Sequence, residues 1–293
     1  MGASASDYGL LLALSVLFGV SFTLTGISVR DIPPFTLAAG RLLIAFALLY
    51  PLMRMNRQKL SPVGMPWLII LASAFFGNAL PFVLISWGQQ TVQAGLTAIF
   101  MAVMPLVTLL LAHWLTEDEK LDRWKVIGVL LGLLGVIVLT GRSALFALGD
   151  DLIRQLAILL AAVCYAINAI ITRKLTKLPR WSVMTALMLL GSLMLVPLSL
   201  VVDHPWLLRP EWSSVASVVA LAVGPTAIAT VMILVIIGRQ GASFLSQINF
   251  LVPVFGMLFG VVLLGEQLPA NAYFALVIIL AGVGLSKLSG ARR

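Results

Sequence analysis

Isolated amide and hydroxyl groups interrupt several apolar stretches of this chain, and they are the groups that could bind a small molecule. Asn and Gln can hold an ammonium or a carboxylate, whereas Phe, Met and Tyr contact an aromatic or apolar body. Spacings of three and four residues place neighbours on one face of a helix. We therefore predict a binding site for a small amphipathic metabolite, formed by Asn78, Phe82, Phe100, Met101, Tyr165, Asn168, Gln247 and Asn249.

Four further residues within apolar stretches suggest special roles. Pro105 and Pro253 each remove a backbone hydrogen bond, which kinks a helix or opens carbonyls to a cavity, so we predict a gating role. Arg41 either binds a substrate carboxylate or caps nearby carbonyls. His113 is either a proton site or an interfacial anchor beside Trp114. The binding-site amides and aromatics have a similar structural alternative, because such side chains also bond or pack between helices.

Catalytic chemistry is not expected. The sequence contains no phosphate-binding loop, no His-Glu-x-x-His zinc motif, no nucleophile elbow and no intramembrane pair of acids. We predict no catalytic residues, no metal site and no cofactor. An integral-membrane enzyme remains the rival class, and a lipid scramblase is a second rival that should show a polar groove facing lipid.

Composition indicates which elements position these residues. Of 293 residues, 61% are hydrophobic and only 10% are charged, whereas soluble domains are about one quarter charged. A helix needs roughly 20 apolar residues to cross a bilayer. Ten such runs are predicted, at Tyr8–Val29, Phe35–Met53, Pro66–Trp87, Ala94–Leu115, Trp124–Thr140, Leu152–Thr172, Trp181–Val202, Val215–Ile237, Ala242–Leu264 and Asn271–Leu288.

The basic residues predict the orientation, because loops on the cytoplasmic side carry the excess of Lys and Arg. With the N-terminus inside, only Arg30, Arg142, Arg154 and Arg209 of the 19 basic residues fall on the outside, and Arg41 falls within a span. Both termini are therefore predicted to be cytoplasmic. The net charge of +8 is explained by these loops, so no nucleic-acid partner is expected.

An internal repeat is the most specific pattern. Pro105 matches Pro253, Glu119 matches Glu266 and Gly135 matches Gly282, at offsets of 146 to 148 positions that Pro51 and Pro197 share. Each unit, 1–146 and 147–293, has five spans, so the second enters the membrane from the opposite side. Inverted repeats are typical of secondary transporters, which present one central site to either compartment.

The chain also resembles a known family. Phe18-Gly19-Val20-Ser21-Phe22, Gly40-Arg41-Leu42, the two prolines and Leu264-Gly265-Glu266-Gln267-Leu268 resemble the EamA-type branch of the drug/metabolite transporter superfamily, in particular its YddG-type bacterial exporters of aromatic amino acids and metabolites. The resemblance implies an all-α membrane fold of ten transmembrane helices, arranged as two inverted five-helix repeats around a central cavity. It also implies export of small metabolites, aromatic amino acids first among them.

The predicted function is that of an inner-membrane secondary transporter that exports amino acids with aromatic or other apolar side chains by alternating access. A broad-specificity exporter of drugs or other metabolites is the alternative within the same class. The expected partners are a small-molecule substrate and the lipid bilayer. Proton antiport and uniport both stay open, because the single intramembrane His, Asp or Glu candidate is His113, near the cytoplasmic end of its predicted span.

Overall fold

The computed structural model describes residues 4–60, 66–115, 123–146 and 150–288, and every regular element within them is a helix. The first part of the chain forms α1 (Ala5–Ser28), α2 (Pro34–Met55), α3 (Trp67–Ala74), η1 (Phe75–Ala79), α4 (Leu80–Gly88), α5 (Ala94–Met101), α6 (Met104–Leu115) and α7 (Arg123–Phe146). The second part forms α8 (Asp150–Thr172), η2 (Arg173–Leu175), α9 (Arg180–Leu198), η3 (Ser199–Asp203), η4 (Pro205–Leu207), α10 (Trp212–Leu221), η5 (Ala222–Ile228), α11 (Ala229–Leu245), α12 (Ile248–Leu264) and α13 (Ala270–Leu288).

Several of these elements follow one another directly and form longer helical stretches. Within the described residues, seven stretches are long and apolar enough to cross a membrane, namely Ala5–Ser28, Pro34–Met55, Trp67–Gly88, Ala94–Leu115, Leu152–Leu175, Arg180–Asp203 and Trp212–Gly241. The segments Ile248–Leu264 and Ala270–Ser286 are apolar but shorter. The all-helical membrane architecture is therefore confirmed, whereas the count of ten spans stays a prediction.

One predicted boundary is wrong. The ninth span was expected to begin at Ala242, but α12 begins at Ile248 and the helical assignment of α11 continues to Leu245. The chain does bend at this point, because Gly241 has φ 81° and ψ 173°, a conformation open to glycine and costly for other residues. A short helical turn therefore separates the Gly241 bend from the start of α12.

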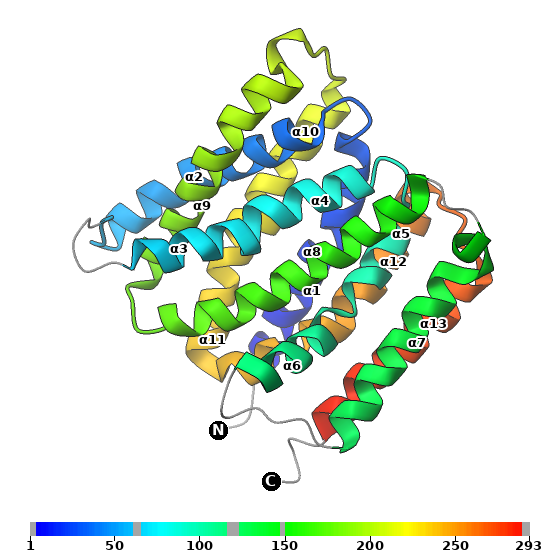
Figure 1. The fold of residues 1–293 in the computed structure, drawn as a ribbon. Coiled ribbons are helices and arrows are strands. Elements are labelled where there is room, and N and C mark those ends of the chain that lie inside the picture. The colour runs from blue at the N-terminus through cyan, green and yellow to red at the C-terminus, as the bar shows by residue number, and fades with distance from the viewer. Residues whose placement is uncertain (1–3, 61–65, 116–122, 147–149, 289–293) are drawn as a thin grey trace.

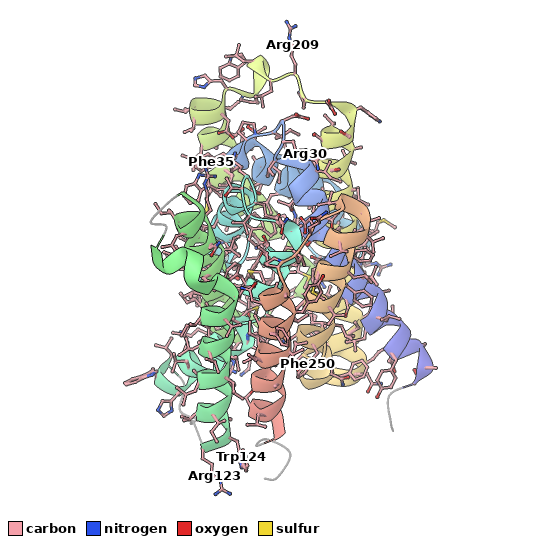
Figure 2. The ribbon with its side chains drawn as sticks, turned by 90° about the vertical axis from the view of Figure 1, so that its right-hand side faces the viewer. Arg30, Phe35, Arg123, Trp124, Arg209 and Phe250 are labelled. Atoms are coloured by element: carbon pink, nitrogen blue, oxygen red, sulfur yellow. The ribbon has the colours of Figure 1, made fainter. Side chains whose placement is uncertain are left out.

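The helices lie side by side in one bundle, with the beginning of α1 and the end of α13 at the same end (Figure 1). Figure 2 shows Arg123 and Trp124 at that end, while Arg30, Phe35 and Arg209 lie toward the opposite end. Within the bundle α1 packs along α12 and α2 packs along α9. All four of these helices contribute residues to the cavity described below.

Helices α7 and α13 form a closely packed pair along one side of the bundle (Figure 1). Their contact depends on glycine, because a Cβ atom on Gly128 would lie 2.5 Å from the carbonyl oxygen of Gly282, and one on Gly282 would lie 2.6 Å from that of Gly128. Packing of small residues lets membrane helices approach at backbone distance. Gly128 and Gly282 therefore have a packing role.

Gly282→Ala is expected to lower the thermal unfolding midpoint of the purified protein, because the added methyl group meets backbone that cannot move aside. Overpacking of this kind costs about 1–3 kcal/mol. Gly284→Ala on the same helix is the matched control, since its Cβ would meet only Phe250 at 3.9 Å. Equal midpoints for the two variants would contradict this account of the pair.

Candidate functional site

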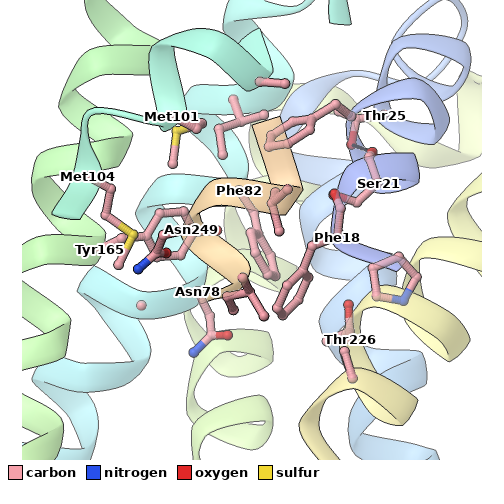
Figure 3. A pocket seen from close by; sticks show the side chains of 18 of the residues that line it. Phe18, Ser21, Thr25, Asn78, Phe82, Met101, Met104, Tyr165, Thr226 and Asn249 are labelled. Carbon is pink, nitrogen blue, oxygen red and sulfur yellow. Dashed lines mark hydrogen bonds between the residues drawn. The ribbon is translucent and has the colours of Figure 1, made fainter. Parts of the chain in front are cut away.

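A cavity of about 350 Å³ lies at the centre of the bundle. It is lined by residues of α1, α2, η1, α4, α5, α6, α8, α9, η5, α11 and α12, so both parts of the chain contribute walls. Figure 3 shows Phe18, Ser21 and Thr25 of α1 facing Met104 and Tyr165 across it. The lining is mostly apolar with a few polar groups, which is typical of a site for a small organic molecule.

Two π-helical segments face this cavity from equivalent positions of the chain. The first, η1, contributes Gly77 and Asn78, and η5 contributes Pro225 and Thr226. Residue 78 lies 147 positions before residue 225, which is the offset of the sequence repeat. A π-helical turn widens the helix and is frequently found at functional sites. The Gly-Asn and Gly-Pro pairs at this offset are the sequence signal for both segments, and neither segment was predicted.

The two prolines predicted to gate both line the cavity, but in different surroundings. Pro105 is the second residue of α6, just after Ala102 and Val103 interrupt the helix that began at Ala94. Pro253 lies inside the continuous helix α12. Equivalent positions of the repeat thus have different backbone conformations in one structure. Their gating role stays a prediction.

Most of the other predicted residues lie around the same space. The cavity is lined by five of them, Asn78, Phe82, Met101, Tyr165 and Asn249 (Figure 3). Asn78 and Phe82 come from the same helical stretch, Trp67–Gly88, and the other three come from three other helices. Their contact with a substrate stays a prediction.

Three predicted binding residues lie elsewhere. Phe100 is fully buried in an apolar cluster with Ile99 and Leu106. Asn168 accepts a hydrogen bond of 2.6 Å from the Ser73 hydroxyl and packs against Gly77, behind the cavity wall. Gln247 is exposed in the turn before α12.

His113 lies near the C-terminal end of α6, away from the cavity lining, with its ring 5.8 Å from that of Trp114. Both interpretations of His113, as a proton site and as an interfacial anchor, therefore stay open.

One face of α1 that lines the cavity was not predicted from the sequence. Phe18, Ser21, Phe22 and Thr25 line the cavity at spacings of three and four residues. Ser21 and Thr25 each donate a hydrogen bond to a backbone carbonyl of the preceding turn, at 2.6 and 2.8 Å. The spacing itself was the available signal, but small hydroxyl residues that bond to their own helix are inexpensive in a membrane and so do not stand out.

Arg41 of α2 is the cationic residue of the lining, and it is only 8% exposed. Its Nε donates a hydrogen bond of 2.7 Å to the hydroxyl of Thr226, and its guanidinium carbon lies 3.9 Å from the centre of the Phe82 ring. Among the described lining residues none is acidic. The cavity therefore contains an isolated positive charge in an otherwise apolar and neutral-polar wall.

Carboxylates bind helix N-termini at the end of the bundle remote from the beginning of α1. Asp203 accepts a hydrogen bond of 2.7 Å from the amide of Thr36, and Asp31 accepts one of 2.6 Å from the hydroxyl of Ser214. Glu266 accepts from the amides of Ala94 and Gly95, at 2.6 and 2.8 Å. Each bond joins the first part of the chain to the second, so these carboxylates hold the two parts together at that end.

A helical membrane protein with a central, largely apolar cavity that both parts of the chain enclose has the architecture of a small-molecule transporter. The family model of the EamA-like transporter family matches residues 6–141 and again residues 152–288. The chain belongs to the EamA-like transporter family, whose members are transporters rather than enzymes.

Curated relatives are similar along nearly the whole chain. "Uncharacterized transporter YoaV" of Bacillus subtilis is 24% identical, covering 97% of both chains. "Uncharacterized inner membrane transporter YedA" of Escherichia coli K12 is 26% identical, covering 96% of this chain and 90% of its own. A "Probable amino-acid metabolite efflux pump" of Salmonella typhimurium is also 26% identical, covering 96% and 94%.

The fold itself also matches a solved structure. One crystal structure superposes with a TM-score of 0.70 over 99% of both chains, at 21% sequence identity. At that identity the match supports the arrangement of the helices and carries no information on the substrate.

Proposed function

We propose that this chain is a secondary transporter that exports amino acids with aromatic or other apolar side chains across the cytoplasmic membrane by alternating access. The central cavity is the observation that carries the proposal. Phe18, Phe82 and Tyr165 give it aromatic walls, and Asn78 and Asn249 add amides that can bind an amino acid's polar end. The name of the Salmonella relative, an amino-acid metabolite efflux pump, supports the same substrate class.

The proposal includes two inverted five-helix repeats, 1–146 and 147–293, that together form ten spans. Three observations support it. The family model matches twice, the two π-helical segments recur at the repeat offset, and residues from both parts line one cavity. Two similar units of opposite orientation can exchange conformations, so that the shared cavity opens first to one side and then to the other.

The orientation proposed for the chain places both termini in the cytoplasm. In the structure the start of α1 and the end of α13 share one end of the bundle with Arg123, whereas Arg30 and Arg209 lie toward the other end (Figure 2). The basic clusters predicted from the sequence then face the cytoplasm, as the positive-inside rule expects. Reporter fusions at the two ends would contradict this topology if they report opposite compartments.

A broad-specificity exporter is a second candidate, and the methionines of the cavity favour it. Met101, Met104 and Met188 come from three different helices and line the same space. Methionine side chains adapt to ligands of different shape, and they are common on promiscuous binding surfaces. Transport of many unrelated compounds at similar rates would favour this candidate over a dedicated amino-acid exporter.

Uptake of labelled amino acids into proteoliposomes tests the proposal directly. Phenylalanine, leucine and glutamate are compared, with and without an imposed pH gradient, against liposomes without protein. Uptake of phenylalanine and leucine above the protein-free level is expected, with little uptake of glutamate. Failure to transport any amino acid would overturn the substrate assignment. Uptake rates that are the same with and without the pH gradient would exclude proton antiport.

Asn78→Ala and Tyr165→Ala are each expected to lower the uptake of both phenylalanine and leucine by about two- to tenfold. Each removes a hydrogen-bonding group from the cavity wall, and such a bond is worth about 0.5–1.5 kcal/mol. Asn56→Ala is the matched control, because this exposed amide lies at the end of α2, outside the cavity lining, and donates to the carbonyl of Leu52. Unchanged uptake of both amino acids in both cavity variants would remove these residues from the binding site.

A further inference from the structure

The guanidinium of Arg41 is held in one position, but part of its hydrogen-bonding capacity is left over. Nε donates to Thr226, whose hydroxyl in turn donates to the carbonyl oxygen of Leu221 at 2.8 Å, and the ring of Phe82 covers one face. Within the described residues the structure records no hydrogen bond from either terminal guanidinium nitrogen. Both terminal nitrogens are therefore available, in one plane, on a side chain that lines the cavity.

An isolated cation at this depth needs a counter-charge. The five acidic residues whose side chains are described, Asp7, Asp31, Asp203, Glu211 and Glu266, all lie close to a helix end. A buried charge without a partner is costly, and the planar fork of arginine matches the two oxygens of a carboxylate. A carboxylate that enters the cavity would supply both the charge and the missing hydrogen-bond acceptors.

The positive charge of Arg41 has no counterpart at the equivalent position of the internal repeat. The residue 147 positions after Arg41 is Met188, which lines the same cavity from α9. Helices α2 and α9 pack against each other, so the site has a cationic corner beside an apolar, adaptable one. This pairing fits a ligand with one carboxylate and an apolar body.

The cavity offers much less to an ammonium group. No acidic side chain is among its described lining residues, so a ligand's ammonium would meet neutral oxygens, such as those of Asn78, Asn249 and Tyr165, or the faces of aromatic rings. A neutral acceptor binds a cation more weakly than a carboxylate binds arginine. The amino group should therefore contribute little to the affinity.

We propose that Arg41 forms an anion subsite that binds the substrate's carboxylate, and that the ligands are monocarboxylates with an aromatic or branched apolar body, whether or not they carry an amino group. This inference deepens the proposed function and rests on it for the link to export. Binding itself is measured separately from transport, so that the two can fail independently.

Calorimetric titration of the purified full chain in detergent with phenylalanine, 3-phenylpropionate and phenethylamine tests the subsite. Phenylalanine and 3-phenylpropionate should bind with affinities within about threefold of each other, whereas phenethylamine, which lacks the carboxylate, should bind about 30-fold more weakly or worse. Phenethylamine that binds as well as 3-phenylpropionate would overturn the proposal. Chloride that binds at Arg41 while 3-phenylpropionate does not would also overturn it.

Variants assign the effect to Arg41. Arg41→Met copies the counterpart Met188 and should weaken 3-phenylpropionate about 30-fold while sparing phenethylamine, and Arg41→Lys should restore part of the affinity. Arg209→Met removes an equivalent charge from an exposed loop and should leave both affinities unchanged. If Arg41→Met does not fold, the comparison of the three ligands on the unmodified chain still decides.

The two proposals have separate signatures. Arg41-dependent binding of 3-phenylpropionate without transport of any amino acid would retain the subsite and overturn the export function. Transport of amino acids that phenethylamine inhibits as strongly as 3-phenylpropionate would retain export and overturn the subsite.

Discussion

Gly19→Leu should yield little folded protein, whereas Gly9→Leu on the same helix should fold as the unmodified chain does. A Cβ atom on Gly19 would lie 2.5 Å from Cβ of Phe255 and 3.0 Å from the backbone nitrogen of Gly256. These atoms belong to the framework of α12, so no change of rotamer relieves the clash. The two helices would have to separate along the contact that encloses the cavity.

The expected cost follows from the size of the added group. Overpacking costs about 1–3 kcal/mol for a few extra methylenes, and a clash with backbone should reach the upper part of that range or exceed it. A loss of about 3 kcal/mol in the free energy of unfolding corresponds to a fall of about 10 °C in the thermal unfolding midpoint for a chain of this length. Gly19→Ala should give a smaller fall, because it adds only the Cβ atom.

Gly9 is the matched control because a Cβ atom there would have no neighbour within 4 Å. Both variants add the same leucine to α1 and replace the same flexible glycine. Fluorescence-detected size-exclusion chromatography and thermal unfolding in detergent measure the outcome. Similar profiles for Gly19→Leu and Gly9→Leu would mean that α1 and α12 do not approach each other as closely as the structure shows.

The helical fold could be predicted from the sequence because the bilayer leaves few choices. Backbone groups must be satisfied within each span, and the membrane thickness sets its length. The predicted limits of the fourth run, Ala94–Leu115, coincide with the ends of α5 and α6. The start of α12 was missed because Ser246 and Gln247 form their turn inside a run that is apolar on both sides.

The binding site was harder to predict, because periodicity identifies the face of a helix but not the direction in which that face points. Asn168 and Tyr165 are neighbours on one face of α8, yet Tyr165 lines the cavity and Asn168 bonds to Ser73 behind it. The π-helical turns add a second difficulty, because each inserts an extra residue and changes which side chains face inward. Thr226 of η5 reaches the cavity in this way.

The interactions that tie the two parts of the chain together depend on tertiary structure. Glu266 was predicted only as a repeat landmark, and its bonds to α5 could not be read from spacing. Its repeat partner Glu119 lies outside the described residues. Glycine explains how the carboxylate reaches its place, because Gly265, at φ 67°, ends α12, and both Gly95 and Gly260 lack the Cβ that would crowd Glu266.

Glu266→Ala should destabilise the protein by about 3 kcal/mol or more. The carboxylate oxygens accept hydrogen bonds from the amides of Ala94 and Gly95 at 2.6 and 2.8 Å, and bonds to a charged group contribute about 1.5–3 kcal/mol each. The negative charge also lies at the positive end of the α5 dipole. Without it, two N–H groups at the start of a membrane helix lose their acceptors.

Hydrogen exchange read by mass spectrometry measures this loss where it occurs. Exchange of the amides that begin α5 should become about 100-fold faster in Glu266→Ala, and by a smaller factor in Glu266→Gln, which keeps one acceptor oxygen. Glu211→Ala is the matched control, because Glu211 is exposed and its carboxylate accepts from the hydroxyl of Ser213 at 3.3 Å but caps no backbone amide of α10. Because Glu266 follows α12 while Ala94 begins α5, faster exchange in Glu266→Ala alone would mean that this carboxylate holds the two parts of the transporter together. Unchanged exchange in Glu266→Ala would show that other contacts hold the two parts together at that end. Equally fast exchange in Glu211→Ala would show that the effect is not specific to Glu266.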